Sequence, residues 1–332
     1  MLTIYLYKAV IFLKKKQSNK ILNCTGKNHI AKAVKLIKAG GLVAFPTETV
    51  YGLGADATND EAVACIFDVK KRPYFNPLII HFSNLSSLAA TVELNRLAEK
   101  LALAFWPGAL TMILPRKNNC PVSLLASAGL ETLAVRIPNH KTANALISAA
   151  MTPIAAPSAN CSGEVSPSRA EHVWQSLGDK VEIILDGGPC KVGVESTVID
   201  LTSSNPTLLR PGGIVLDDIE KIIGPVSLSD GSKNKIRSPG MLDRHYAPSI
   251  PLRLNANKAR PGEAFLAFGS RANSHHVNLS HRGDLKEAAT NLFAMLRMLD
   301  QPNFKGIAVM KVPSVGLGVA INDRLKRAAT PL

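Results

Sequence analysis

Hydrophobic and polar positions alternate between two periods along the chain. Apolar residues at positions 30, 33, 34, 36 and 37 follow the helical period, so His29–Ala39 is predicted to be an amphipathic helix that ends at Gly40 and Gly41. Leu42–Pro46 follows as a short, buried strand. Asp60–Lys70 is predicted to be a helix with Thr58 or Asn59 as its N-cap. This alternation predicts an α/β fold.

Further segments of both kinds continue the pattern. The other predicted strands are Leu78–Phe82, Leu110–Leu114, Thr132–Pro138, Pro153–Ala156, Val181–Leu185, Thr197–Leu201 and Thr207–Leu209. The predicted helices between them are Asn95–Phe105, Thr142–Ala150 and Arg169–Leu177.

The composition and the hydrophobic periodicity of the chain change near residue 224. Gly224–Pro248 is rich in Gly, Ser, Pro and Lys and lacks either period, which is typical of a linker. After it, two predicted strands (Ala264–Phe268 and Gly306–Val312) alternate with two predicted helices (Leu285–Leu299 and Val319–Ala329). A second, smaller α/β domain is therefore expected.

Length and composition are consistent with two globular domains. The chain has 332 residues, of which 46% are hydrophobic and 19% charged, and this excludes a disordered protein. Five cysteines are scattered without a Cys-x-x-Cys pair, which argues against a disulfide framework or a zinc ribbon and indicates a reducing, intracellular setting. No run of about 18 apolar residues is present, so no membrane span is expected.

The net charge of +14 is concentrated at the N-terminus. Residues 1–38 hold nine lysines and no acid, whereas residues 39–332 carry only +5, which suits an anionic ligand without requiring bulk nucleic-acid binding. Met1–Leu13 is mostly apolar and precedes Lys14–Lys16, the reverse of the order in a secretory signal. Residues 1–24 are expected to be an extension outside the fold, with a membrane-surface or RNA-contacting arm as the alternatives.

The sequence lacks the common catalytic and nucleotide-binding motifs. There is no phosphate-binding P-loop, nucleophile elbow or His-Glu-x-x-His zinc helix. Residues 52–57 formally match the dinucleotide-binding pattern G-x-G-x-x-A, but polar or bulky residues separate these glycines from the strand. A basic segment also stands where the acidic ribose partner would be expected, so we reject a dinucleotide site.

Polar residues instead recur where predicted strands end. The turn after residue 46 holds Thr49, the helix end at residues 70–72 carries three cations, and His81 lies in the strand that follows. Arg136 lies inside an apolar strand, where an unpaired guanidinium would be costly. Residues 156–160, Ser196 and Arg210 repeat the pattern. Carboxyl ends of strands are the usual ligand side of an open α/β sheet, so a binding site is expected there.

Each residue also has an ordinary structural interpretation. A lone arginine such as Arg136 is commonly salt-bridged within a fold, and a Lys-Lys-Arg helix end complements the helix dipole. His81 alone would fit a satisfied, half-buried histidine, and residues 158–160 a simple turn. The functional interpretation gains because several such elements recur in one domain.

Together these segments resemble the YrdC-like domain of the threonylcarbamoyl-AMP synthases over about residues 28–214. The landmarks, in order, are PTETVYGLGADA, KKRPYFNPLIIH, FWPGALTMIL, VRIP, APSANCSG, ESTVID and LLRPGG. Ser238–Pro248 and Ala320–Ala329 resemble the linker and the ending of the long, two-domain form, although Leu242-Asp243 departs from its usual basic–aromatic pair.

The resemblance implies a fold and a domain organisation. It implies a twisted mixed sheet with a concave cleft, followed by a smaller, Rossmann-like α/β domain. The expected boundaries are 1–24 for the extension, 25–223 for the YrdC-like catalytic domain, 224–248 for the linker and 249–332 for the C-terminal domain.

The resemblance also implies a reaction in which L-threonine, bicarbonate and ATP give threonylcarbamoyl-AMP and pyrophosphate. The carbamate of threonine is already an anion, so its attack on the α-phosphorus needs positioning and charge neutralisation more than a nucleophilic dyad. Matching positions would bind threonine through Thr49, His81, Arg136, Ala156 and Ser196. They would bind ATP through Lys70, Arg72, Asn76, Thr132, Ser158, Ser166 and Arg210. Mg²⁺ would arrive on the ATP phosphates, with no metal site in the protein.

The linker adds a further expectation. Met241, Arg244, His245 and Tyr246 lie close together in it, so Ser238–Pro248 is expected to fold over the nucleotide as a lid, with His245 or Tyr246 touching ATP. A passive tether that docks on the second domain is the alternative.

The implied setting is a cytoplasmic enzyme that hands its product to a complex that transfers threonylcarbamoyl to tRNA; binding of tRNA or double-stranded RNA stays open. A rival function is an RNA-binding or ribosome-maturation factor with a basic cleft, against which the modest +5 of residues 39–332 counts. A second rival is a carbamoyl-transferring maturation enzyme, but such chains usually carry zinc-finger cysteines, and none are found here.

Overall fold

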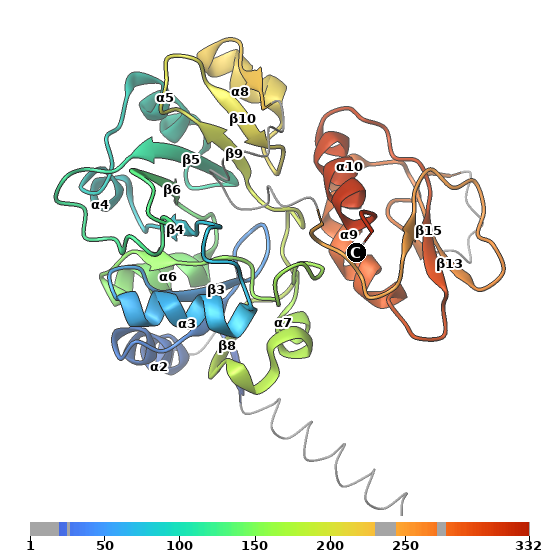
Figure 1. The fold of residues 1–332 in the computed structure, drawn as a ribbon, viewed down its shortest axis with the longest axis horizontal. Helices are drawn as coiled ribbons and strands as arrows, with labels where there is room; N and C mark the ends of the chain where they lie inside the picture. The colour runs from blue at the N-terminus through green and yellow to red at the C-terminus, as the bar shows by residue number, and fades with distance from the viewer. Residues whose placement is uncertain (1–19, 25–26, 230–243, 271–276, 332) are drawn as a thin grey trace, which may run out of the picture.

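The computed structural model describes residues 20–24, 27–229, 244–270 and 277–331, which form a large and a small α/β unit (Figure 1). The strands of the large unit are β1 (Ile21–Asn23), β2 (Val43–Phe45), β3 (Gly52–Asp56), β4 (Ile79–His81), β5 (Leu110–Pro115), β6 (Thr132–Arg136), β7 (Ile154–Ala155), β8 (Ile183–Asp186), β9 (Thr197–Asp200), β10 (Thr207–Arg210) and β11 (Ser227–Leu228). Its helices are α2 (Lys27–Lys38), α3 (Asp60–Lys70), α4 (Leu85–Ala89), α5 (Arg96–Phe105), α6 (Lys141–Ala150), α7 (Ala170–Leu177) and α8 (Leu216–Ile223), with a short 3₁₀ turn at Gly178–Lys180.

The eleven strands join in one mixed, twisted sheet in the order β1-β8-β2-β3-β7-β4-β6-β5-β9-β10-β11. Alternation along β2 shows how helices cover both faces. Val43 and Phe45 pack in a cluster with α2 and α6, whereas Ala44 between them belongs to the main core with α3, α5 and α7. Successive side chains of a strand point to opposite faces, so both faces of β2 are buried. The expected α/β fold with a twisted mixed sheet is confirmed.

Local signals set the helix limits well. α3 covers the predicted residues 60–70, and the side chain of Asn59 accepts a hydrogen bond from the backbone N–H of Ala62 as its N-cap. Asn95 caps α5 in the same way through the N–H of Ala98. Both caps are short-range contacts, so the sequence predicts these helix starts to within one residue.

The segment with the dinucleotide-like glycines is a strand, β3, which pairs antiparallel with β2. A Cβ at Gly54 would lie 2.6 Å from the Phe45 ring and 2.9 Å from Ile154, and one at Gly52 would lie 3.2 Å from the Cβ of Ala156. The glycines therefore allow close packing between neighbouring strands. The rejection of a dinucleotide loop agrees with this placement.

The small unit is a four-stranded parallel sheet with two long helices. Its strands are β12 (Leu252–Arg253), β13 (Glu263–Ala267), β14 (Val277–Asn278) and β15 (Gly306–Val309), in the order β12-β15-β13-β14. Its helices are α9 (Leu285–Leu299) and α10 (Leu317–Ala328), which pack against each other. The second α/β domain is thus present; the Rossmann-like detail stays an expectation.

Two expected domain boundaries are wrong. Ile21–Asn23, placed in an extension outside the fold, form β1 and pair in parallel with β8, and the Lys20 ammonium donates to the backbone oxygens of residues 179 and 181. Ser227–Leu228, placed in the linker, form β11 and pair with β10. Both are edge strands of only three and two residues, which is too short for a period to show in the sequence. Residues 1–19 and 230–243, which hold most of the extension and of the lid segment, lie outside the described residues.

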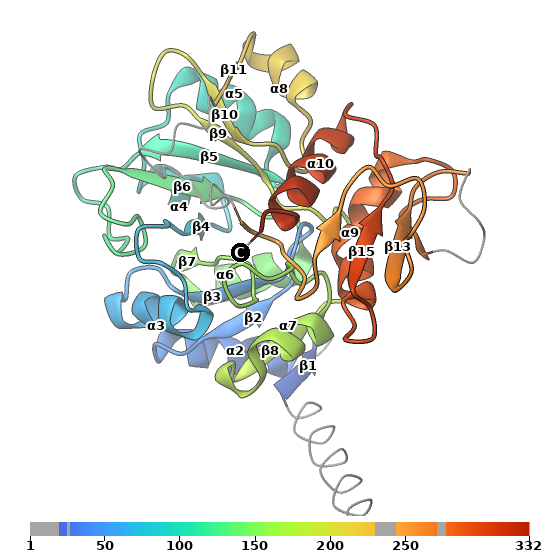
Figure 2. The ribbon, with the colours of Figure 1, turned by 45° about the vertical axis from the view of Figure 1, so that its right-hand side comes forward.

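The two units are closely docked (Figure 2). Gly193 of the large unit lies against α9, where a Cβ would be 2.3 Å from the Cα of Thr290, and its φ is +76°. The Thr290 hydroxyl donates to the Lys191 carbonyl at 2.8 Å, and the buried Val194 belongs to the apolar core of the small unit. Helix α9 therefore packs directly on the loop that leads into the site. In the described part of the chain, no helix combines the length and apolar character needed to cross a membrane.

Candidate functional site

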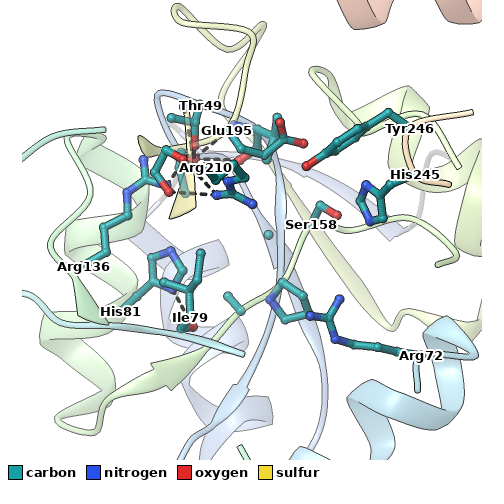
Figure 3. A pocket seen from close by; sticks show the side chains of 16 residues that line it. Thr49, Arg72, Ile79, His81, Arg136, Ser158, Glu195, Arg210, His245 and Tyr246 are labelled. Atoms are coloured by element: carbon teal, nitrogen blue, oxygen red, sulfur yellow. Dashed lines mark hydrogen bonds between the residues drawn. The ribbon is translucent and has the colours of Figure 1, made fainter. Parts of the chain in front are cut away.

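A pocket lies where several strands of the large sheet end, closed on one side by the segment that enters the small unit (Figure 3). Its walls come from the turn after β2, the loop after α3, the ends of β4, β6 and β10, the loop after β7, the start of β9, and residues 245–246. The lining residues are Thr47, Thr49, Val50, Gly52, Arg72, Ile79, His81, Arg136, Ala156, Pro157, Ser158, Glu195, Ser196, Arg210, His245 and Tyr246.

Arg136 is held at the end of β6 by three partners. Its Nε donates to the Gly108 carbonyl at 3.1 Å, its Nη1 to the Thr49 hydroxyl at 3.0 Å, and its Nη2 to Glu48 Oε1 at 2.7 Å. Both side chains of the Glu48–Arg136 pair are buried, with exposures of 8% and 4%. The ordinary interpretation of Arg136 as a salt-bridged residue is therefore present. A guanidinium has five N–H groups, so among the described residues these three bonds leave two N–H groups available to a ligand.

His81 lies next to Arg136, because β4 and β6 pair in parallel with these two residues in register. Burial, reinforced by the Arg136 charge, lowers the pKa of His81 to about 3. The ring is therefore neutral at physiological pH, with Nδ1 3.2 Å from the Ile79 carbonyl. With the proton on Nδ1, Nε2 is a hydrogen-bond acceptor.

Arg210 and Ser196 form the middle of the pocket. Arg210 Nε and Nη2 both donate to the Ser196 carbonyl, at 3.1 and 3.0 Å, and Nη2 also lies 3.2 Å from the Ser196 hydroxyl. That hydroxyl lies 2.7 Å from the hydroxyl of Thr111 on β5. Burial lowers the pKa of Arg210, so its charge is poorly solvated. An anionic ligand would compensate for that lost solvation.

A second cationic group lies at the end of α3. Arg72 donates to the backbone and side-chain oxygens of Asn76, at 3.0 and 2.7 Å, and to the Pro77 carbonyl at 2.8 Å. The Lys70 ammonium is buried and donates to the carbonyls of Ser158 and Asn160. Burial, and then the Arg72 charge, lower the pKa of Lys70 to about 7. Lys70 thus supports the loop that carries Ser158.

His245 and Tyr246 reach the pocket from the side of the small unit, facing Arg72 and Ser158 (Figure 3). Both are buried, at 6% and 1% exposure. Burial, and then the nearby cations Arg72 and Lys70, lower the pKa of His245 well below its ordinary value. Among the described residues, His245 Nδ1 and the Tyr246 hydroxyl are buried without a hydrogen-bond partner. Such atoms are costly unless a ligand satisfies them.

The pocket brings together ten of the fourteen residues that the sequence singled out. All five residues expected to bind threonine line the pocket. Of the residues expected to bind ATP, five line it: Arg72, Ser158, Arg210, His245 and Tyr246. Lys70, Asn76 and Ser166 lie behind the wall and bond to residues that line it. Thr132 does not reach it: it opens β6, four residues from Arg136, and pairs with Pro115. At about 3.3 Å per residue, these two lie some 13 Å apart along the strand.

Sequence reasoning missed two carboxylates. Glu48 holds Arg136 and accepts from the backbone N–H of Asn139, and Glu195 lines the pocket itself. Each lies next to a singled-out residue, Thr49 and Ser196. A buried arginine needs a carboxylate partner, and this requirement could have drawn attention to both.

The side chains of the described residues do not form a resident metal site. Within the described residues, no three His, Cys, Asp or Glu side chains gather closely enough to hold an ion. The two carboxylates at the site are already engaged by arginines.

The chain matches known proteins along both units. A family model described as "Telomere recombination" matches residues 35–212, and one described as "Threonylcarbamoyl-AMP synthase, C-terminal domain" matches residues 214–330. The chain is 43% identical over 319 residues to a threonylcarbamoyl-AMP synthase of Pyrococcus abyssi, covering 90% of this chain and 93% of the relative. It is 41% identical to one of Bacillus subtilis, covering 92% and 94%. A crystal structure of P. abyssi Sua5 complexed with L-threonine superposes with a TM-score of 0.83 at 42% identity, covering 90% of this chain and 94% of that one.

Proposed function

The chain belongs to the threonylcarbamoyl-AMP synthase family, and from this we propose that its pocket joins L-threonine, bicarbonate and ATP into threonylcarbamoyl-AMP with release of pyrophosphate. One observation supports assigning the substrates to this pocket. Arg136 and His81 lie on one side, Arg72, His245 and Tyr246 lie on the other, and Ser158 and Arg210 lie between (Figure 3). Two substrates could therefore meet in the middle.

Threonine binds on the Arg136 side in this proposal. The two free N–H groups of Arg136 meet its carboxylate, and Thr49 and Ser196 offer hydroxyls. The neutral His81 ring accepts a hydrogen bond without adding a charge that would repel the amino group. The backbone of Ala156, at the end of β7, completes this side.

ATP binds on the other side in this proposal. Arg72, Arg210 and Ser158 face its phosphates, while His245 and Tyr246 offer rings and unpartnered polar atoms. Lys70 and Asn76 hold this wall from behind, and Ser166 acts through Glu195. The Thr132 assignment rests on the family resemblance alone.

The chemistry follows from this arrangement. The threonine amine adds to bicarbonate and water leaves, which gives a carbamate anion. A carbamate oxygen attacks the α-phosphorus, the bond to the β-phosphate oxygen breaks, and pyrophosphate leaves. Arg210 and Ser158 lie where negative charge develops, so positioning and electrostatic stabilisation drive the step. Mg²⁺ enters as part of the MgATP substrate, bound by phosphate oxygens.

The segment 244–248 is proposed to act as the described part of a lid, since His245 and Tyr246 close the nucleotide side. Excluding water there protects a product that hydrolyses readily. We further propose that the enzyme works in the cytoplasm and passes its product to a complex that modifies tRNA. No observation favours the RNA-binding alternative.

The test is pyrophosphate release from ATP by the purified full chain. Release should require both L-threonine and bicarbonate, and should be far slower with serine. The matched variants are Arg136→Gln, on the threonine side, and Arg72→Gln, on the ATP side. The first should raise the KM for threonine and the second the KM for ATP. Equal release without threonine, or the same KM changes in both variants, would contradict the proposal.

A further inference from the structure

The end of the chain contributes a buried arginine to the wall of this pocket. Arg324, on α10 of the small unit, has no exposed surface. Its Nε donates to Glu195 Oε2 at 2.7 Å, and its Nη1 donates to the Pro211 carbonyl at 2.9 Å and to Asp323 at 2.6 Å. Its guanidinium also lies 5.1 Å from the centre of the Tyr246 ring. One residue of the second unit thus touches two residues that line the pocket.

The contact with Glu195 sets the charge of the pocket. Among the described residues that line it, Glu195 is the one carboxylate, beside Arg72, Arg136 and Arg210. Both its oxygens are engaged, Oε1 by the Ser166 hydroxyl at 2.5 Å and Oε2 by Arg324. Without Arg324 this carboxylate would repel phosphates and would compete with them for Arg210.

The contact with Tyr246 sets the position of a ring. Tyr246 is 1% exposed, stacks on Phe293 of α9 at 5.6 Å, and takes a positive φ of 62°. A cation against an aromatic ring is a directional contact. Arg324 therefore helps to fix the orientation of Tyr246 on the nucleotide side.

Unpartnered atoms mark the same region. Six buried side-chain atoms have no hydrogen-bond partner among the described residues, and five belong to residues of the pocket or its supporting layer: Asn76, Asn160, His245, Tyr246 and Arg324. Arg324 Nη2 is one of them. A cluster of unsatisfied donors and acceptors around one pocket indicates a site built for a polar ligand.

We propose that Arg324 is a positioning residue for ATP: it neutralises Glu195 and orients Tyr246, so the small unit helps to form the nucleotide side of the site. This deepens the proposed function and rests on it. Docking of the two units is a separate role, which α9 and Gly193 already serve. The charge role predicts an effect on ATP that docking alone would not give.

The experiment measures ATP and threonine affinities by calorimetry on the full chain, together with melting temperature. Arg324→Gln should weaken ATP binding about tenfold or more, the scale of one hydrogen bond to a charged group, and change threonine affinity less than about twofold. Arg324→Lys keeps the charge and should lose less. In the double variant Arg324→Gln with Glu195→Gln, the repulsive carboxylate is gone, so much of the ATP affinity should return.

Thr290→Val is the control for docking. Thr290, on α9, donates through its hydroxyl to the Lys191 carbonyl at 2.8 Å across the interface of the units, and it does not line the pocket. Its loss should lower the melting temperature without weakening ATP binding.

Three results would overturn the inference: unchanged ATP affinity in folded Arg324→Gln, equal loss in Thr290→Val, or no recovery in the double variant. If Arg324→Gln does not fold, the comparison of Arg324→Lys with the double variant decides by the same criteria. A native chain that binds neither substrate would refute the proposed function instead.

Discussion

Removing Arg136 should have two separable effects, one on stability and one on threonine binding. Glu48 and Arg136 form a buried pair at 2.7 Å, with side-chain exposures of 8% and 4%. Removing one partner of a buried pair leaves an uncompensated charge and costs about 3–5 kcal/mol. Arg136→Met should therefore lower the free energy of unfolding by an amount in that range, whether or not Arg136 binds threonine.

A second variant separates the two roles. In Arg136→Met with Glu48→Gln, the orphaned carboxylate is replaced by a neutral amide of the same shape, so most of the lost stability should return. Threonine affinity should not return, because the ligand carboxylate still lacks its charge-assisted partner. That contact contributes about 1.5–3 kcal/mol, which corresponds to an affinity loss of about tenfold to more than hundredfold.

The assay pairs denaturant unfolding with calorimetric titration of threonine. Glu48→Gln alone is the control, because it keeps Arg136 together with its contacts to Thr49 and Gly108. If the double variant binds threonine as tightly as Glu48→Gln does, Arg136 is only a structural residue. If the single and double variants are equally unstable, the buried-charge argument is wrong.

Three further predictions concern separate parts of the chain. Because the pKa of Lys70 is lowered to about 7, its charge is lost as the pH rises through 7, so ATP affinity should fall between pH 6 and 9. Lys70→Arg should flatten this pH profile of ATP affinity, and an equally steep profile in that variant would contradict the assignment. Gly193→Ala should lower the melting temperature and speed proteolysis between the units, since its Cβ would meet α9 at 2.3 Å and its φ is +76°. In the control Gly188→Ala, φ is also positive but the Cβ meets nothing within 4 Å, so equal losses in both variants would show that backbone strain, and not contact with α9, is the cause. Deleting residues 1–24 should lower the melting temperature relative to a chain that begins at residue 20, because β1 pairs with β8. Equal melting temperatures of the two chains would show that this edge strand adds no stability.

Local interactions explain what the sequence determined. The helix limits of α3 and α9 match the predictions because the caps at Asn59 and Asp284 act over three residues. The strand ends that carry His81 and Arg136 were also identified, as was Ser196 just before β9, since polar residues interrupt or border apolar runs there. The resemblance to one family then placed ten residues that the structure gathers around one pocket.

Long-range contacts explain what only the tertiary structure decided. β1 has no local period and exists because β8, some 160 residues later, offers an edge. Gly54 of β3 is required because a Cβ there would meet Phe45 and Ile154. Arg324 lies 129 residues from Glu195 in the sequence, yet their contact closes the wall of the site. Packing between distant segments sets such pairings, and no local pattern encodes them. The sequence therefore determined the elements and most of the chemistry, and the tertiary structure decided which charges neutralise each other.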